Sequence, residues 1–148
     1  MNVVALKPAT AEPRIVRVLI AVAKQTRATL GMRLAEIGLA TGEDDVILAM
    51  QDGKPICIAE LSRRIGIRHM TMQRLIDQLV ERGHVELAEA PLFRLSPKGA
   101  DTISEIAALR LRLASEIESV LGIEVASKLT EYLETLEDGF GYSLKPTA

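Results

Sequence analysis

The sequence predicts a mainly α-helical protein with one short β-hairpin. Apolar residues recur at helical spacing in most segments and alternate as in a strand in only one. Aromatic residues make up 3% of the 148 residues and Trp is absent, so aliphatic side chains must form the core, which suits helices better than a sheet. A content of 48% hydrophobic and 26% charged residues is typical of one soluble globular domain.

The N-terminal part predicts an arm followed by a long helix. Residues 1–13 are rich in Ala and Pro, which indicates a flexible arm. Residues 14–40 read as helix, and the pattern leaves open a break near Gly31. Apolar residues between Ile15 and Ala23 lie around most of the helix circumference. This helix is therefore expected to be buried on more than one side.

Residues 41–96 predict three short helices and a hairpin. Thr41 stands three residues ahead of Asp44, a spacing close to a capping box, and the first short helix stops at Gly53. The second follows Pro55 and ends at Gly66. Its apolar positions fall on one face: Ile58, Leu61 and Ile65.

The third short helix spans residues 69–82 and stops at Gly83. Its apolar stripe follows the spacing i, i+3, i+4, i+7 and i+8: Met72, Leu75, Ile76, Leu79 and Val80. The stretch "HVELAEAPLFRLS" then predicts a small hairpin, with a turn at Ala90-Pro91 and a return strand from Leu92 to Leu95.

The C-terminal part, residues 97–138, predicts two further helices before a tail at 139–148. The first begins at Pro97, runs for about 37 Å and is broken at Gly122. The apolar residues of this helix spread over too wide an arc for a helix that lies on one surface, so we expect it to form a symmetric dimer together with the N-terminal helix. The expected dimer contacts are Ile15, Val18, Leu19, Val22, Leu109, Leu113, Ile117, Val120, Leu121, Leu129, Leu133 and Leu136.

Charge is segregated along the chain although the net charge is only −2. Residues 53–84 carry six basic and three acidic side chains, whereas residues 85–148 carry six basic and eleven acidic ones. A basic region on an acidic body can bind a polyanion in one orientation. Three short helices followed by a hairpin form a winged helix-turn-helix, whose third helix enters the DNA major groove. The candidate DNA contacts are Lys54, Arg63, Arg64, Arg68, His69, Thr71, Gln73, Arg74, Gln78 and Arg94.

Within this set the third helix carries the expected base contacts. Arg68, His69 and Thr71 lie at its first turn and are expected to contact phosphates or bases. Gln73 and Arg74 lie one turn further, where bidentate contacts with adenine or guanine are possible.

The stretches "GLATGEDDVILAM", "ICIAELSRRIGIRHMTMQRLIDQLVERGHVE" and "LFRLSPKG" resemble the multiple-antibiotic-resistance regulator (MarR) family over residues 14–138. The last looks like the leucine-threonine-x-x-glycine that begins this family's long dimer helix. The resemblance implies a homodimeric transcription factor, usually a repressor, that binds a pseudo-palindromic operator. It also implies that a small ligand often releases the DNA.

Two features depart from the family pattern. The aspartate-arginine pair at the tip of the family's wing is missing; Glu86 and Glu89 occupy this region and leave Arg94 as its only cation. Arg68 stands where the family often has a capping Ser, which weakens the cap and adds a ligand for phosphate or guanine.

Two classes of function remain open from the sequence. The first is a cytoplasmic DNA-binding regulator whose two recognition helices lie about 34 to 36 Å apart, one DNA turn. The second is a winged-helix module that binds a protein partner through the same face, as the acidic wing would allow. DNA binding that weakens with salt distinguishes the first from the second.

Other classes lack supporting residues. No uncharged run is long enough to span a membrane, and six apolar residues before Lys24 are too few for a signal peptide. Cys57 is the single cysteine; we expect an inert thiol rather than an oxidant sensor. His69 and His84 lack neighbours at metal-ligand spacing, and no nucleophile-base pair or phosphate-binding loop is present. We expect no enzyme activity, no metal and no cofactor.

Overall fold

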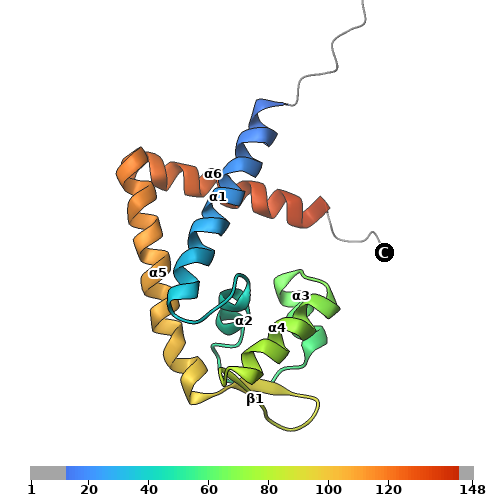
Figure 1. The fold of residues 1–148 in the computed structure, drawn as a ribbon. Coiled ribbons are helices and arrows are strands. Elements are labelled where there is room, and N and C mark those ends of the chain that lie inside the picture. The colour runs from blue at the N-terminus through green and yellow to red at the C-terminus, as the bar shows by residue number, and fades with distance from the viewer. Residues whose placement is uncertain (1–12, 144–148) are drawn as a thin grey trace, which may run out of the picture. The chain divides into compact units, whose positions relative to one another are not determined.

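The computed structural model describes residues 13–143, and the side chains up to Gly141. It contains the predicted mainly α-helical fold with one hairpin (Figure 1). The elements in chain order are α1 (Arg14–Glu36), α2 (Glu43–Ala49), α3 (Ile58–Ile65), α4 (His69–Glu81), β1 (Val85–Leu87), β2 (Phe93–Leu95), α5 (Pro97–Leu121) and α6 (Ile123–Ser143). Residues 1–12 of the expected arm lie outside the described residues. Residues 139–143, expected in the tail, belong to α6.

The chain divides into two compact units, the first ending at Ile103 and the second beginning at Ser104. The first unit therefore holds α1, the three short helices, the hairpin and the first turns of α5. The second holds the remainder of α5 and all of α6.

The core of the first unit lies where α2, α3 and α4 pack against one another. The apolar stripe of α4 turns inward as its period predicts, because residues three and four apart share a helix face. Its buried members are Met72, Leu75, Ile76 and Leu79. Val80, which the sequence pattern assigned to the same stripe, is 40% exposed because it lies at the edge of that face.

Helix α1 is continuous, so the break considered near Gly31 does not occur. Gly31 instead allows a close approach: a β-carbon there would lie 2.5 Å from Oγ1 of Thr41. Leu30 and Leu34 are buried, whereas every residue from Pro13 to Gln25 is exposed. Burial on several sides, expected from the sequence, is therefore absent from the first half of α1 in the single chain.

The start of α2 differs from the predicted capping box. Its N-cap is Gly42, and no side chain caps it, so Thr41 does not have this role. The Glu43 carboxylate instead accepts a hydrogen bond of 2.7 Å from the backbone N–H of Ala40. This bond folds the Glu43 side chain into the protein, where its accessible surface is 0%.

The hairpin is antiparallel, with Val85 opposite Leu95 and Leu87 opposite Phe93. A backbone pair not predicted from the sequence adds a third segment, because Ile56 and Phe93 exchange N–H···O bonds of 2.8 and 2.9 Å. The hairpin is thereby attached to the chain just before α3.

The Ser-Pro-Lys-Gly stretch begins α5 for identifiable steric reasons. The N–H of Gly99 donates to Oγ of Ser96 at 3.1 Å, which caps the helix. A β-carbon at Gly99 would overlap the carbonyl oxygen of His84. Glycine at this position therefore lets α5 begin in contact with the chain that leads from α4 into the hairpin.

Candidate nucleic-acid interface

Helices α3 and α4 form the helix-turn-helix. Gly66 ends α3 in the left-handed conformation, and the N–H groups of Gly66 and Ile67 both donate to the carbonyl of Ser62. Arg68 then occupies the N-cap of α4 without capping it by its side chain. Its guanidinium is therefore not used to hold the helix end.

The outward face of α4, defined here as Met70, Arg74, Asp77 and Glu81, lies opposite the buried stripe. All four of these residues are exposed. Positive charge precedes negative charge along this face, because Arg74 lies in the N-terminal half whereas Asp77 and Glu81 lie in the C-terminal half. A polyanion would therefore be attracted to the first two turns and repelled further along the helix.

Arg68, His69, Thr71 and Arg74 are the predicted contacts that are exposed at the beginning of α4. Neither arginine has an acidic partner within the part of the chain that the structure describes. Their positive charge is thus not neutralised by the protein's own carboxylates.

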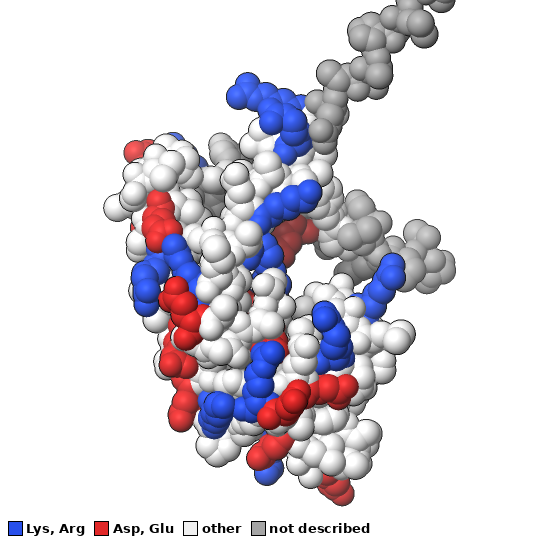
Figure 2. All heavy atoms as spheres, viewed as in Figure 1, with Lys and Arg blue, Asp and Glu red and all other residues white. Residues whose placement is uncertain are grey.

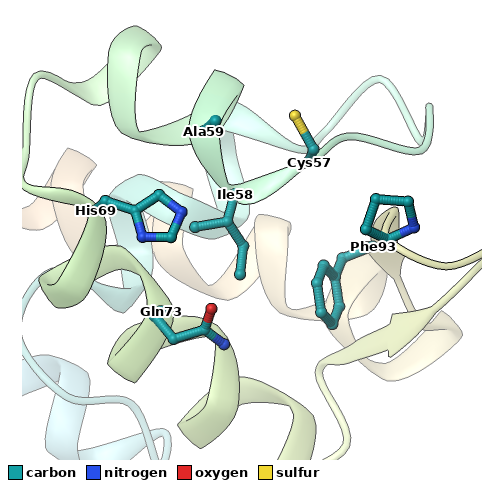
Figure 3. Close-up of a pocket in the computed structure, with 7 residues that line it drawn as sticks. Cys57, Ile58, Ala59, His69, Gln73 and Phe93 are labelled. Carbon is teal, nitrogen blue, oxygen red and sulfur yellow. The ribbon is translucent and has the colours of Figure 1, made fainter.

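His69 and Gln73 lie on a flank of α4 rather than on its outward face. They line a hollow of about 400 Å³ between α3, α4 and the hairpin (Figure 3). The amide of Gln73 also donates to Oδ1 of Asp77 at 2.9 Å. This bond uses one of the two amide N–H groups, so base contact by Gln73 could use the second N–H and the amide oxygen. The remaining lining residues are Cys57, Ile58, Ala59, Pro91 and Phe93.

The other predicted cations are mostly paired. Arg63 and Arg64 both bind the carboxylate of Glu60, and Arg94 binds Glu86 across the hairpin at 2.9 Å. Figure 2 shows basic and acidic side chains interspersed on the face drawn, rather than one continuous basic patch. These pairs are exposed, so the cations remain accessible at a small energetic cost. Among the described residues Lys54 has no such pair and is exposed, whereas Gln78 is uncharged and half-buried.

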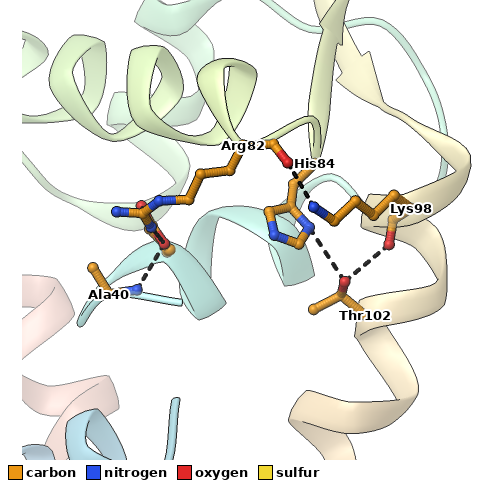
Figure 4. A network of polar contacts seen from close by, with 6 residues as sticks. Ala40, Arg82, His84, Lys98 and Thr102 are labelled. Carbon is orange, nitrogen blue, oxygen red and sulfur yellow. Dashed lines mark hydrogen bonds and ion pairs between the residues drawn. The ribbon is translucent and has the colours of Figure 1, made fainter. Parts of the chain in front are cut away.

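The C-terminal end of α4 is fixed by a polar network that sequence reasoning missed (Figure 4). The guanidinium of Arg82 donates to both oxygens of Glu43, at 2.8 and 2.6 Å. Nζ of Lys98 donates to the carbonyl of Arg82 at 2.7 Å. These contacts join α4 to the start of α2 and to the start of α5.

The same network continues to a buried histidine. Nδ1 of His84 lies 3.3 Å from Oγ1 of Thr102, and this hydroxyl donates to the carbonyl of Lys98. His84 is 4% exposed. No signal in the sequence distinguishes this histidine from an exposed one.

The residues expected at a dimer interface are exposed in the single chain, with some exceptions. In α1 the exposed fractions range from 36% for Leu19 to 74% for Ile15, and in α6 Leu129 and Leu133 are 39% and 42% exposed. Leu109 is 3% exposed, so in the single chain it is buried rather than available to a partner. Leu113 and Leu136 are intermediate. The remaining members are exposed: Val18, Val22, Ile117, Val120 and Leu121.

Among the described residues no helix is long and apolar enough to cross a membrane. No group of three or more His, Cys, Asp or Glu side chains in the same residues could hold a metal ion.

No protein-family model matches the sequence, and no curated protein matches it. The fold is nevertheless similar to solved structures of MarR family regulators. Rv2887 of Mycobacterium tuberculosis, in complex with DNA, aligns with 18% sequence identity and a TM-score of 0.74. The alignment covers 84% of this chain and 98% of the Rv2887 chain. The reduced form of MarR from E. coli aligns with 20% identity and a TM-score of 0.75, over 84% of this chain and 94% of the MarR chain. A MarR transcriptional regulator from Methanosarcina mazei aligns with 18% identity and a TM-score of 0.75, over 86% of this chain and 90% of its own chain. The chain therefore has the MarR winged-helix fold.

Proposed function

We propose that the protein is a MarR-type transcriptional regulator, a cytoplasmic repressor that binds a pseudo-palindromic DNA operator as a homodimer. One observation carries the proposal: Arg68 and Arg74 project from the first turns of α4 without a carboxylate partner among the described residues. The winged-helix fold presents this end of its third helix to the major groove. MarR family neighbours with this fold have been solved in complex with DNA.

In this mode the first half of α4 reads bases and the rest of the unit holds the backbone. Arg74 is suited to bidentate hydrogen bonds with guanine, and Arg68 and Lys54 to phosphates. Arg63 and Arg64 can reach phosphates by exchanging Glu60 for a stronger anion. The acidic wing, whose Arg94 is bound to Glu86, has no minor-groove role in this proposal.

A second copy of the chain is the partner proposed for the apolar surfaces of α1 and α6. Among the described side chains of α6, up to Gly141, not one is buried. A helix in water depends on packing of its apolar stripe, and this helix has such a stripe without a partner. An isologous dimer would cover it and would supply the second α4 that a palindromic site requires.

The test of DNA binding is a salt titration with random-sequence duplex DNA. We expect binding at low salt whose logarithm falls linearly with the logarithm of salt concentration, with a slope of about −5 if about six phosphates are neutralised per dimer. Fluorescence anisotropy of a labelled duplex measures it. No binding at low salt contradicts the proposal and favours the alternative function, a winged-helix adaptor for a protein partner.

Replacing Arg74 with alanine should weaken binding to the specific site by about 1 to 3 kcal/mol and relax the preference at one base pair. The reason is that its outward side chain is the main guanine-reading group of the proposed interface. Anisotropy with the site enriched from a random library, and repeated enrichment with the variant, measure the two effects.

Arg94→Ala is the matched control for this substitution. It removes the same charge from the same unit, but from a side chain paired with Glu86 in the wing. The affinity of Arg94→Ala for the specific site should change much less. Equal losses for the two variants would show that only total charge matters and would remove Arg74 from the base-reading role.

A further inference from the structure

Met70 is the feature of α4 that the proposed function does not yet use. It lies in the first turn of α4 and is 84% exposed. It shares the outward face with Arg74, one helical turn away. Met70 is not among the lining residues of the hollow between α3, α4 and the hairpin.

Single exposed apolar residues are common on proteins and need no function. The position of Met70 distinguishes it, because its neighbours on the helix are the groups proposed to approach DNA. Arg68 precedes it by two residues and Thr71 follows it directly, and both are exposed. If α4 enters the major groove by its N-terminal half, Met70 enters with it.

The major groove offers an apolar side chain one kind of partner. Thymine carries a C5 methyl group there, whereas adenine, guanine and cytosine present only hydrogen-bonding groups. Methionine is unbranched and flexible, so its thioether and terminal methyl can adapt to such a group without exact shape complementarity. The contact would remove both apolar surfaces from water.

We propose that Met70 is a specificity-determining residue that contacts the C5 methyl of a thymine in each half-site. Four residues of helix rise span about 6 Å, and base pairs are stacked about 3.4 Å apart. The thymine therefore lies within about two base pairs of the base pair read by Arg74. This inference rests on the proposed function, since it requires α4 to occupy the groove.

The test removes the methyl from the DNA and the side chain from the protein in turn. A site is first enriched from a random duplex library with the unaltered protein. Each thymine of the half-site is then replaced by deoxyuridine, symmetrically in both halves, and affinity is measured by anisotropy for the unaltered protein and for Met70→Ala. Deoxyuridine differs from thymidine in DNA only by the lost methyl.

One thymine position should stand out. Deoxyuridine there should weaken binding of the unaltered protein about fourfold per half-site, the effect of losing burial of about one methyl group. Met70→Ala should bind the thymine site more weakly by a similar factor and should not distinguish thymine from uracil. Met70→Leu, which keeps an apolar side chain, should retain the distinction.

Val80→Ala is the matched control, because Val80 is another exposed apolar residue of α4 but lies in its acidic C-terminal half. Its response to deoxyuridine should equal that of the unaltered protein. If no duplex is enriched, both the proposed function and this inference fail. If a site is enriched but deoxyuridine has no effect, or its effect persists in Met70→Ala, the role of Met70 is overturned while the proposed function stands.

Discussion

Replacing Leu129 and Leu133 together with glutamate should separate the proposed dimer into monomers and weaken binding to a two-half-site operator about a hundredfold or more. The two side chains lie one turn apart on the apolar stripe of α6 and are 39% and 42% exposed in the single chain. Two carboxylates on each copy would be buried without partners in an isologous interface, which costs far more than the packing could supply. A monomer binds only one half-site and therefore lacks the increase in affinity that comes from binding both half-sites at once.

Sedimentation or light scattering at micromolar concentration gives the oligomeric state, and anisotropy gives the affinity. The effect should be confined to two-half-site DNA, because binding of a single α4 to one half-site does not need the second copy. A variant that remains dimeric would show that α6 lies outside the interface. A variant that is monomeric but retains full operator affinity would contradict the need for a dimer.

Ser127→Glu with Thr135→Glu is the matched control for this pair. It adds the same two charges to the same helix, but both positions lie away from the stripe that contains Leu129 and Leu133. We expect it to remain dimeric, with only the small loss of DNA affinity that added negative charge produces. Comparison of the two double variants separates loss of the interface from general repulsion of DNA.

Helical periodicity allowed most of the fold to be predicted. The spacing of Met72, Leu75, Ile76 and Leu79 places them on one face whatever they pack against, and all four are buried. Gly66 and Gly122 also marked helix ends correctly, because each follows a helix with a positive φ that other residues rarely adopt. Local rules were sufficient for these helix faces and helix ends.

Features that depend on distant partners could not be predicted in the same way. Leu109 belongs to the same wide apolar arc as Ile117, yet the first is buried and the second is 39% exposed, because tertiary packing covers only part of α5. By contrast, the hydrogen bond between Gln73 and Asp77 could have been predicted from the sequence, because the two residues are four apart on a helix. It was missed because Gln73 was assigned only to DNA.

The buried carboxylate of Glu43 in α2 illustrates the limit most clearly. Glu43 opens an acidic run, "EDD", in which no local pattern marks a buried side chain, yet its accessible surface is 0%. Its partner Arg82 lies 39 residues away. No spacing rule connects positions at such a distance, and only the fold brings α2 and the end of α4 together.

Replacing Arg82 with alanine should therefore destabilise the protein by about 2 to 4 kcal/mol, as expected when one partner of a buried ion pair is removed. The Glu43 carboxylate would keep the N–H of Ala40, at 2.7 Å, but would lose both guanidinium hydrogen bonds. Loss of a buried charge's counter-ion is costly because water cannot replace it at a fully covered site. The value lies in the lower part of the usual range since the Arg82 side chain is 39% exposed. Urea unfolding at a fixed protomer concentration measures it.

Two further variants decide whether the buried acid is the cause. Arg94→Ala breaks an exposed pair, with side chains 51% and 43% accessible, and should cost less than about 1 kcal/mol. Glu43→Leu with Arg82→Leu removes both charges and should regain much of the stability lost in Arg82→Ala, because the penalty arises from the unpaired carboxylate. If the double variant were as unstable as the single one, the loss would come from the Arg82 side chain's own packing.

The ion pair between Arg82 and Glu43 also holds the end of α4 against α2. Arg82→Ala should therefore weaken operator binding as well. The double leucine variant keeps α4 packed and should recover operator affinity.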